Sequence, residues 1–205
     1  MNFNDERLKV VGIGGTMRQG SASLGALRRA LEASAEAGAD TELLDLRELN
    51  LPMYEPGRPL GEFGPKVERL VEAVRGADAL LISTGAYHGT LAGVTKNALD
   101  FIQFLSKDER PYLDERVVGL ISTAGGDQAA TNANQAMVHA VHALRGIVAP
   151  LMVGIPKAWQ RFENGDIADE GYAERLDMLG RLVVELAGKL GSGHSRYEAT
   201  AGIAV

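Results

Sequence analysis

GGTMRQGSAS, residues 14–23, lies between an apolar run at 8–13 and a periodic segment at 24–37. The run has the length and β-branched content of a buried strand, and the segment predicts a helix with one apolar face. That face carries Leu24, Leu27, Leu31 and Ala35. The first N–H groups of a helix have no intrahelical partner and lie at the positive end of the macrodipole, so they favour an anion. Side chains in the loop add donors that suit a terminal phosphate, namely Thr16, Arg18, Ser21 and Ser23. Ser21 or Ser23 can also cap the helix through its hydroxyl.

Better-known glycine loops do not fit this stretch. The Rossmann fingerprint needs a third glycine where Met17 stands. Gly15 to Ser21 has Walker A spacing, but Ser21 occupies the place of the lysine that reaches the β- and γ-phosphates. The glycine loop of protein kinases requires further motifs that the sequence lacks. The loop is therefore predicted to bind a monophosphate.

Composition limits the classes of protein to consider. The chain has 205 residues, 45% hydrophobic and 23% charged, which predicts one domain over 1–190 and a flexible tail over 191–205. A net charge of −6 gives no basic footprint for nucleic acid, and no apolar run approaches the ~20 residues of a membrane span. The N-terminal MNFNDERLK lacks the layout of a signal peptide, so we expect a cytoplasmic protein. The absence of cysteine means that any redox chemistry must come from a bound cofactor.

Strand and helix signals alternate along the chain. Strands are expected at 8–13, 41–46, 77–84, 115–123 and 147–154, and helices at 24–37, 66–75, 92–105, 129–144 and 172–190. This alternation predicts an α/β fold with a doubly wound, five-stranded parallel sheet. In the flavodoxin-like order 2-1-3-4-5, the loops after the first, third and fourth strands meet at one edge.

Those three loops are rich in glycine, which lets backbone approach a flat ligand. They read GGTMRQGS, TGAYHG and TAGGDQ. A monophosphate at the first loop with a planar ring against the other two has the shape of FMN.

The residues of these loops carry a family resemblance: the chain resembles the NADPH-dependent FMN reductases of flavodoxin-like fold, which include quinone, azo and chromate reductases. The family's first motif, G-S/T-x-R-x-x-S-x-N, is matched with Ser23 in the position of its asparagine. Its second motif, P-E-Y-N-G-S followed by P-G-x-L-K-N-A-L-D-W, is matched at Tyr87, Gly89, Thr90, Gly93, Lys96, Asn97, Ala98, Leu99 and Asp100. The LPMYEP segment places Pro52 and Tyr54 in register with a third family loop.

The chain departs from the second motif at several positions. Gly85 and Ala86 replace Pro-Glu, His88 replaces asparagine, and Phe101 replaces tryptophan. With glycine at 85, the turn at 85–89 is expected to be less rigid than in the family.

The resemblance implies a set of cofactor-binding residues. Thr16, Arg18, Ser21 and Ser23 would hold the phosphate. The ribityl chain and isoalloxazine ring would lie along Gly85, Ala86, Tyr87, His88 and Gly89, and along Thr123, Ala124, Gly125 and Gly126.

The function that the resemblance implies is an FMN-dependent oxidoreductase with NADPH or NADH as donor. The acceptor would be a quinone, an azo compound, a metal or free flavin. Partners are expected to be this small-molecule acceptor and further copies of the chain in a homodimer or homotetramer, with no nucleic acid and no membrane. The alternatives are an FMN-binding electron carrier or redox sensor, and an enzyme that releases reduced FMN as a product.

Other chemistry-bearing residues receive structural interpretations. We expect no catalytic side chain, since hydride transfer between stacked rings removes no proton from carbon. His139 and His142 have helical spacing but no third ligand, so no metal site is predicted. Asn97 and Asp100 are expected to make structural hydrogen bonds. Trp159 is either a lid near the flavin or a loop anchor.

Overall fold

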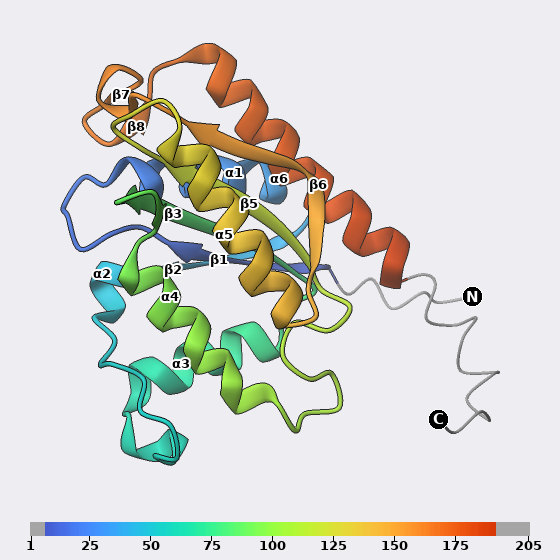
Figure 1. Cartoon of the computed structure of the whole chain (residues 1–205). Coiled ribbons are helices and arrows are strands. Elements are labelled where there is room, and N and C mark those ends of the chain that lie inside the picture. The colour runs from blue at the N-terminus through green and yellow to red at the C-terminus, as the bar shows by residue number, and fades with distance from the viewer. Residues whose placement is uncertain (1–6, 192–205) are drawn as a thin grey trace, which may run out of the picture.

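A computed structural model describes residues 7–191 and shows a parallel sheet with helices on both faces (Figure 1). Its strands run in the order β2-β1-β3-β5-β6, which confirms the predicted flavodoxin-like order. They are β1 (Lys9–Gly14), β2 (Asp40–Asp45), β3 (Ala79–Tyr87), β5 (Val117–Thr123) and β6 (Ile147–Ile155). A short strand, β4 (Thr90–Leu91), pairs antiparallel with the end of β3.

The helices form two layers. α1 (Ala22–Glu36) and α6 (Glu170–Gly191) cover one face, while α3 (Pro65–Arg75), α4 (Gly93–Asp100) and α5 (Ala129–Ala143) cover the other (Figure 1). Shorter elements complete the described chain: α2 (Leu46–Leu49), η1 (Leu60–Glu62), η2 (Phe101–Leu105), η3 (Ala158–Gln160) and the hairpin of β7 (Phe162–Glu163) with β8 (Asp166–Ile167).

The core lies on both faces of the sheet because successive strand side chains point to opposite sides. Val10 packs with α1 and α6, and the next residue, Val11, packs with the α3 layer. Leu81 and Ile82 divide in the same way. This explains why the strands read as continuous apolar runs.

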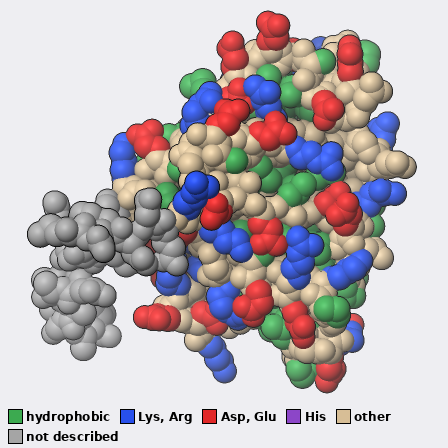
Figure 2. All heavy atoms as spheres, turned by 180° about the vertical axis from the view of Figure 1, so that it is seen from behind, with side chains coloured by type: hydrophobic (Ala, Val, Ile, Leu, Met, Phe, Trp, Pro, Cys, Tyr) green, Lys and Arg blue, Asp and Glu red, His purple; other side chains and the backbone are tan. Residues whose placement is uncertain are grey.

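α1 and α6 approach closely through a glycine. A Cβ on Gly180 would lie 2.1 Å from the carbonyl oxygen of Ala30, so only glycine allows this crossing. Ser34 Oγ donates to the Gly180 carbonyl at 2.9 Å, and Arg29 forms a two-pronged ion pair with Asp177. Figure 2 shows the molecule from the side opposite to that of Figure 1, with acidic and basic side chains interspersed over that face.

The sheet differs from the prediction where β3 ends. Gly85 to Tyr87 continue β3 instead of turning, and β4 follows after His88 and Gly89. The predicted turn at 85–89 is therefore wrong in extent, because Ala86 and Tyr87 pair with Leu91 and Thr90 and only His88 and Gly89 form the turn.

Helix boundaries also differ. The predicted helix at 92–105 is α-helical only to Asp100 and then becomes η2. α6 includes Gly191, the first residue assigned to the tail, and the remainder of that tail, 192–205, lies outside the described residues. Ala35 is exposed rather than on the buried face of α1, where Ser34 lies instead.

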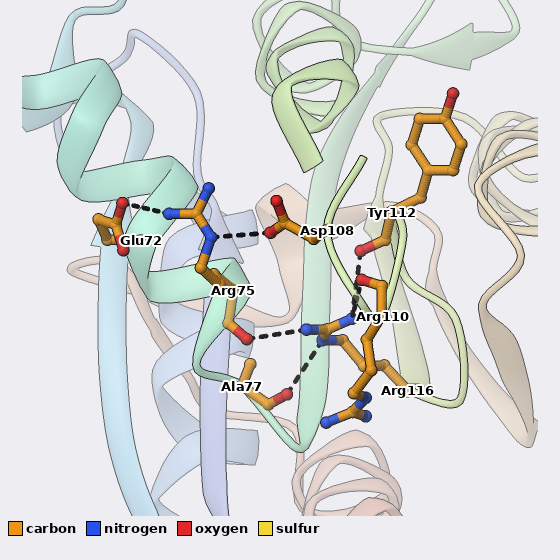
Figure 3. A network of polar contacts seen from close by, with 7 residues as sticks. All are labelled: Glu72, Arg75, Ala77, Asp108, Arg110, Tyr112 and Arg116. Carbon is orange, nitrogen blue, oxygen red and sulfur yellow. Dashed lines mark hydrogen bonds and ion pairs between the residues drawn. The ribbon is translucent and has the colours of Figure 1, made fainter. Parts of the chain in front are cut away.

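The amino-terminal edge of the sheet is closed by Arg116, which is 2% exposed. Its guanidinium donates to the backbone carbonyls of Ala77 at 3.0 Å, Arg75 at 2.8 Å and Tyr112 at 3.2 Å (Figure 3). Arg75 and Ala77 lie at the C-terminal end of α3, where the helix dipole favours a cation. Burial lowers the pKa of Arg116 to about 10, so the side chain remains charged at neutral pH.

Candidate functional site

The loop of residues 15–21 turns sharply before α1. Gly15 and Gly20 have φ angles of 93° and 63°, a region that favours glycine. Ser21 is the N-cap residue, and its carbonyl accepts from the N–H groups of Leu24 and Gly25. The N–H groups of Ala22 and Ser23 precede this first intrahelical bond and thus remain for an anion.

The serine hydroxyls do not cap the helix. Ser21 makes no side-chain cap; its Oγ lies 2.8 Å from Ser23 Oγ. The prediction that either serine caps α1 through its side chain is therefore wrong. Ser23 is fully buried, and its carbonyl accepts from Ser83 Oγ at 2.7 Å. Ser23 does not line the hollow that lies where the three predicted loops meet. Its hydroxyl instead contacts that of Ser21.

A hollow of about 240 Å³ lies where the three loops meet. From the first loop it is lined by Thr16, Arg18, Ser21 and Ala22, from β3 by Gly85, Ala86 and Tyr87, and from the turn after β5 by Thr123, Ala124 and Gly125. Ala158 and Trp159 complete it. Among the predicted residues, Ser23, His88, Gly89 and Gly126 do not line this hollow.

Gly85 allows the first loop and β3 to approach each other. A Cβ at this position would lie 2.8 Å from Thr16 Cγ2, closer than carbon atoms pack. Gly85 also pairs with Thr123 of β5, which joins all three loops at one point. The glycine that departs from the family motif thus fits the threonine of the first loop.

His88 and Gly89 form the two-residue turn of the β3–β4 hairpin. Their φ angles are 50° and 81°, and both positions of a type I′ turn require positive φ. Asparagine tolerates this conformation better than most residues, which accounts physically for asparagine in the family motif. The turn consists of two residues between paired strands, and its lower rigidity relative to the family stays a prediction.

The turn after β5 is tied to the segment that follows β6. The Ala124 N–H donates to the Ile155 carbonyl at 3.0 Å, and the Ala158 N–H donates to the Ala124 carbonyl at 2.9 Å. Trp159 is 72% exposed and lines the hollow. It is therefore not a buried anchor, and the sequence signal for it was an aromatic residue at the carboxyl end of the last strand.

Arg161 anchors the segment that carries Trp159. Its Nε donates to the Pro156 carbonyl at 3.2 Å, its guanidinium lies 4.7 Å from the ring centroid of Tyr172, and it pairs with Asp169. Hydrogen bonding from the Tyr172 N–H and from Arg161 holds the pKa of Asp169 below its usual value. The carboxylate is thus charged at neutral pH and keeps the anchor.

Asn97 has the structural role expected for it. Its Oδ1 accepts from the Tyr54 N–H at 2.9 Å, and its Nδ2 donates to the Pro52 carbonyl at 2.8 Å. Asp100 pairs with Lys96 one turn earlier on α4. The LPMYEP loop is thereby fixed to α4.

His139 and His142 are exposed on α5. Within residues 7–191, no group of three histidine, cysteine or acidic side chains is placed to hold a metal ion. None of the helices in that range is long and apolar enough to cross a membrane.

The electrostatics of the hollow suit an anionic, flat ligand. Arg18 is the charged residue among those lining it, and no carboxylate of the described chain joins it there. Cβ atoms placed on Gly125 and Gly126 would meet nothing within 4 Å, so their backbone faces open space. A phosphate at the loop and a ring along the glycine backbone fit these residues.

Comparison with known proteins agrees with this geometry. Residues 8–160 match the family described as NADPH-dependent FMN reductase. An NAD(P)H-dependent FMN reductase of Pseudomonas aeruginosa is 36% identical over 118 residues, which cover 58% of this chain and 61% of that protein. An FMN-dependent NADPH-azoreductase of Staphylococcus haemolyticus is 31% identical over 142 residues, 65% of this chain and 72% of that one.

The fold is shared with a flavoenzyme NAD(P)H:(acceptor) oxidoreductase from Paracoccus denitrificans, with a TM-score of 0.67 and 22% identity over 89% of this chain and 98% of that one. In sequence, the chain spans about three fifths of the length of the Pseudomonas aeruginosa relative. Because the family match spans most of the described residues, this chain belongs to the NADPH-dependent FMN reductase family.

Proposed function

We propose that this protein is an FMN-dependent NAD(P)H oxidoreductase. The observation that carries the proposal is the hollow at the carboxyl edge of the sheet. One loop lines it with hydrogen-bond donors suited to a phosphate, and another lines it with glycine backbone. One positively charged side chain, that of Arg18, lines this hollow, and no carboxylate among the described residues does. This lining suits a phosphorylated flavin.

The residues divide between two roles. Thr16, Arg18, Ser21 and the first N–H groups of α1 hold the phosphate. The Ala124 N–H donates to the Ile155 carbonyl, so it is the N–H of Gly125, which lines the hollow, that faces negative charge at the edge of the ring. When bound, FMN supplies the redox chemistry by taking hydride from the nicotinamide and giving electrons to the acceptor.

The acceptor belongs to the class of small electron-poor molecules: a quinone, an azo compound, a metal or free flavin. The name of the staphylococcal relative supports an azo compound as one member of this class. We further propose a single domain over 1–190, a cytoplasmic location and a homodimer or homotetramer, as the family resemblance implies.

The test is anaerobic mixing of the FMN-loaded protein with NADPH or NADH while the visible flavin absorbance is followed. An oxidoreductase bleaches the flavin rapidly and transfers electrons to added quinone or azo dye. An electron carrier stays oxidised on the same timescale, which would overturn the proposal. Desalting beforehand distinguishes a tightly held cofactor, which keeps the protein yellow, from FMN used as a substrate.

A further inference from the structure

A second hollow, of about 500 Å³, adjoins the first hollow, in which the flavin is proposed to bind. The two share Arg18, Ala22, Ala158 and Trp159, so they lie side by side. The residues found only in the second hollow come from the first loop and from the β7–β8 hairpin: Gln19, Gly20, Phe162, Asn164 and Gly165.

The walls of this second hollow are held in place by backbone contacts. A Cβ on Gly25 of α1 would lie 1.8 Å from the Gly165 carbonyl oxygen, so the hairpin rests directly on the helix. A Cβ on Gly165 would lie 3.4 Å from Gly20 Cα, which places the hairpin tip against the first loop. Together with the Arg161 anchor, these contacts form the site before any ligand arrives.

The lining has a definite chemistry. Trp159 and Phe162 offer aromatic surface, and an indole that is 72% exposed is available for stacking. Gln19 and Asn164 carry amides that donate and accept hydrogen bonds. Arg18 provides positive charge, and no described carboxylate lines the hollow. These are the features that recognise a planar heterocycle joined to phosphate.

We infer that the second hollow binds the adenylate half of the nicotinamide dinucleotide, with adenine stacked on Trp159 and hydrogen-bonded by the amides of Gln19 and Asn164. This inference rests on the proposed function, because it assigns the donor's distal half to the hollow beside the flavin. The four shared residues place the hollows side by side, so one extended dinucleotide reaches both.

The first experiment compares NADPH with reduced nicotinamide mononucleotide, which lacks the adenylate, as donors to the FMN-saturated protein. Trp159→Ala should raise the half-saturating NADPH concentration about fivefold to a hundredfold, the range for loss of one base–aromatic stack. Because Trp159 also lines the first hollow, the readout is the ratio of the NADPH to the mononucleotide half-saturating concentration. This ratio should rise by about fivefold to a hundredfold in Trp159→Ala, and Trp159→Phe should return it close to the wild-type ratio. Equal effects on both donors, or none on either, would overturn the inference.

The second experiment places negative charge at the hairpin tip. Asn164→Asp keeps a residue that tolerates the φ of 52° found there and should weaken NADPH without changing the mononucleotide. Gln160→Glu is the matched control, because Gln160 is exposed beside Trp159 but lines neither hollow. An equal response of the two variants would contradict the assignment.

A third readout does not depend on activity. Trp159 is the single tryptophan of the chain and lines both hollows, so the protein is first saturated with FMN, and further changes in fluorescence then report on the second hollow. Titration with ADP should quench the emission to saturation, and Asn164→Asp should shift the curve to higher ADP. Unchanged emission would refute the inference. If ADP binds but neither donor reduces the flavin of the wild-type protein, the proposed function fails while the nucleotide site remains.

Discussion

The two edges of the parallel sheet each carry an arginine with the same chemistry in opposite circumstances. At the amino edge, Arg116 is buried and its donors are engaged by backbone carbonyls (Figure 3). At the carboxyl edge, Arg18 is exposed, and its guanidinium has no hydrogen-bond partner within residues 7–191. One arginine completes the fold, and the other is left for a ligand.

The polar groups at the amino edge therefore stabilise the fold, and those at the carboxyl edge are available to bind a ligand. The carbonyls of Arg75 and Ala77 at the end of α3 accept from Arg116, whereas the N–H groups of Ala22 and Ser23 at the start of α1 remain for an anion. Leaving polar groups free at an open edge costs little because water solvates them until an anion replaces it. The following predictions separate the two roles.

The largest effect is expected at the amino edge. Arg116→Met should lower the free energy of unfolding by about 3 kcal/mol or more, because buried carbonyls lose their partner. Arg18→Met, the matched change at the open edge, should alter it by about 0.5 kcal/mol or less. Urea unfolding of the FMN-free protein measures both. Similar losses for the two variants would break the comparison.

The second prediction concerns FMN affinity, which should depend on Arg18 at the carboxyl edge. Arg18→Ala should weaken FMN by about 1.5–3 kcal/mol, roughly tenfold to a hundredfold, through loss of a charge-assisted contact. Riboflavin, which lacks the phosphate, should bind almost unchanged. Arg181→Ala on α6 is the control, since Arg181 is an exposed arginine far along the chain. An equal loss for riboflavin and FMN would place Arg18 away from the phosphate.

A smaller effect is expected within the turn after β5. Gly125→Val should weaken FMN by about tenfold, because new methyl groups enter the hollow. Gly126→Val should have a weaker effect, since Gly126 does not line the hollow. Fluorescence titration of FMN compares the two variants. Retention of full affinity in both would remove this turn from the site.

The smallest effect is expected at His88. His88→Asn preserves the positive-φ turn and should change the rate of flavin reduction by less than about tenfold, below the range of general acid–base catalysis. Stopped-flow reduction of the FMN-loaded variant by NADPH tests this. A thousandfold loss with FMN still bound would show that His88 is catalytic.

Much of the fold followed from local patterns. The strands are buried on both faces, so their apolar runs are long enough to identify, and the glycine loop fixes the junction with α1. The β7–β8 hairpin was missed because two-residue strands carry too little periodicity. The extent of β3 was misjudged because a histidine at a positive-φ position resembles an ordinary loop residue.

Within the site, the residue types were informative but their orientation was not. Ser23 stands in the asparagine position of the family motif, but it is buried against Ser21, a placement set by the rotation of α1 and by Ser83. Trp159 lies more than a hundred residues from the first loop, and its place beside Arg18 depends on the hydrogen bond between Ala124 and Ala158. Such contacts come from tertiary structure, so the local sequence can nominate Trp159 but cannot place it.

The crossing of α1 and α6 at Gly180 has a consequence for how the chain folds during synthesis. The buried face of α1 is complete early, but the helix that covers it is made last among the described elements. At typical translation speeds, roughly 7 to 30 s separate the emergence of the two helices. During this interval Leu27 and Leu31 have no α6 to pack against. The nascent chain therefore exposes apolar surface, to which chaperones bind, until residue 180 is available.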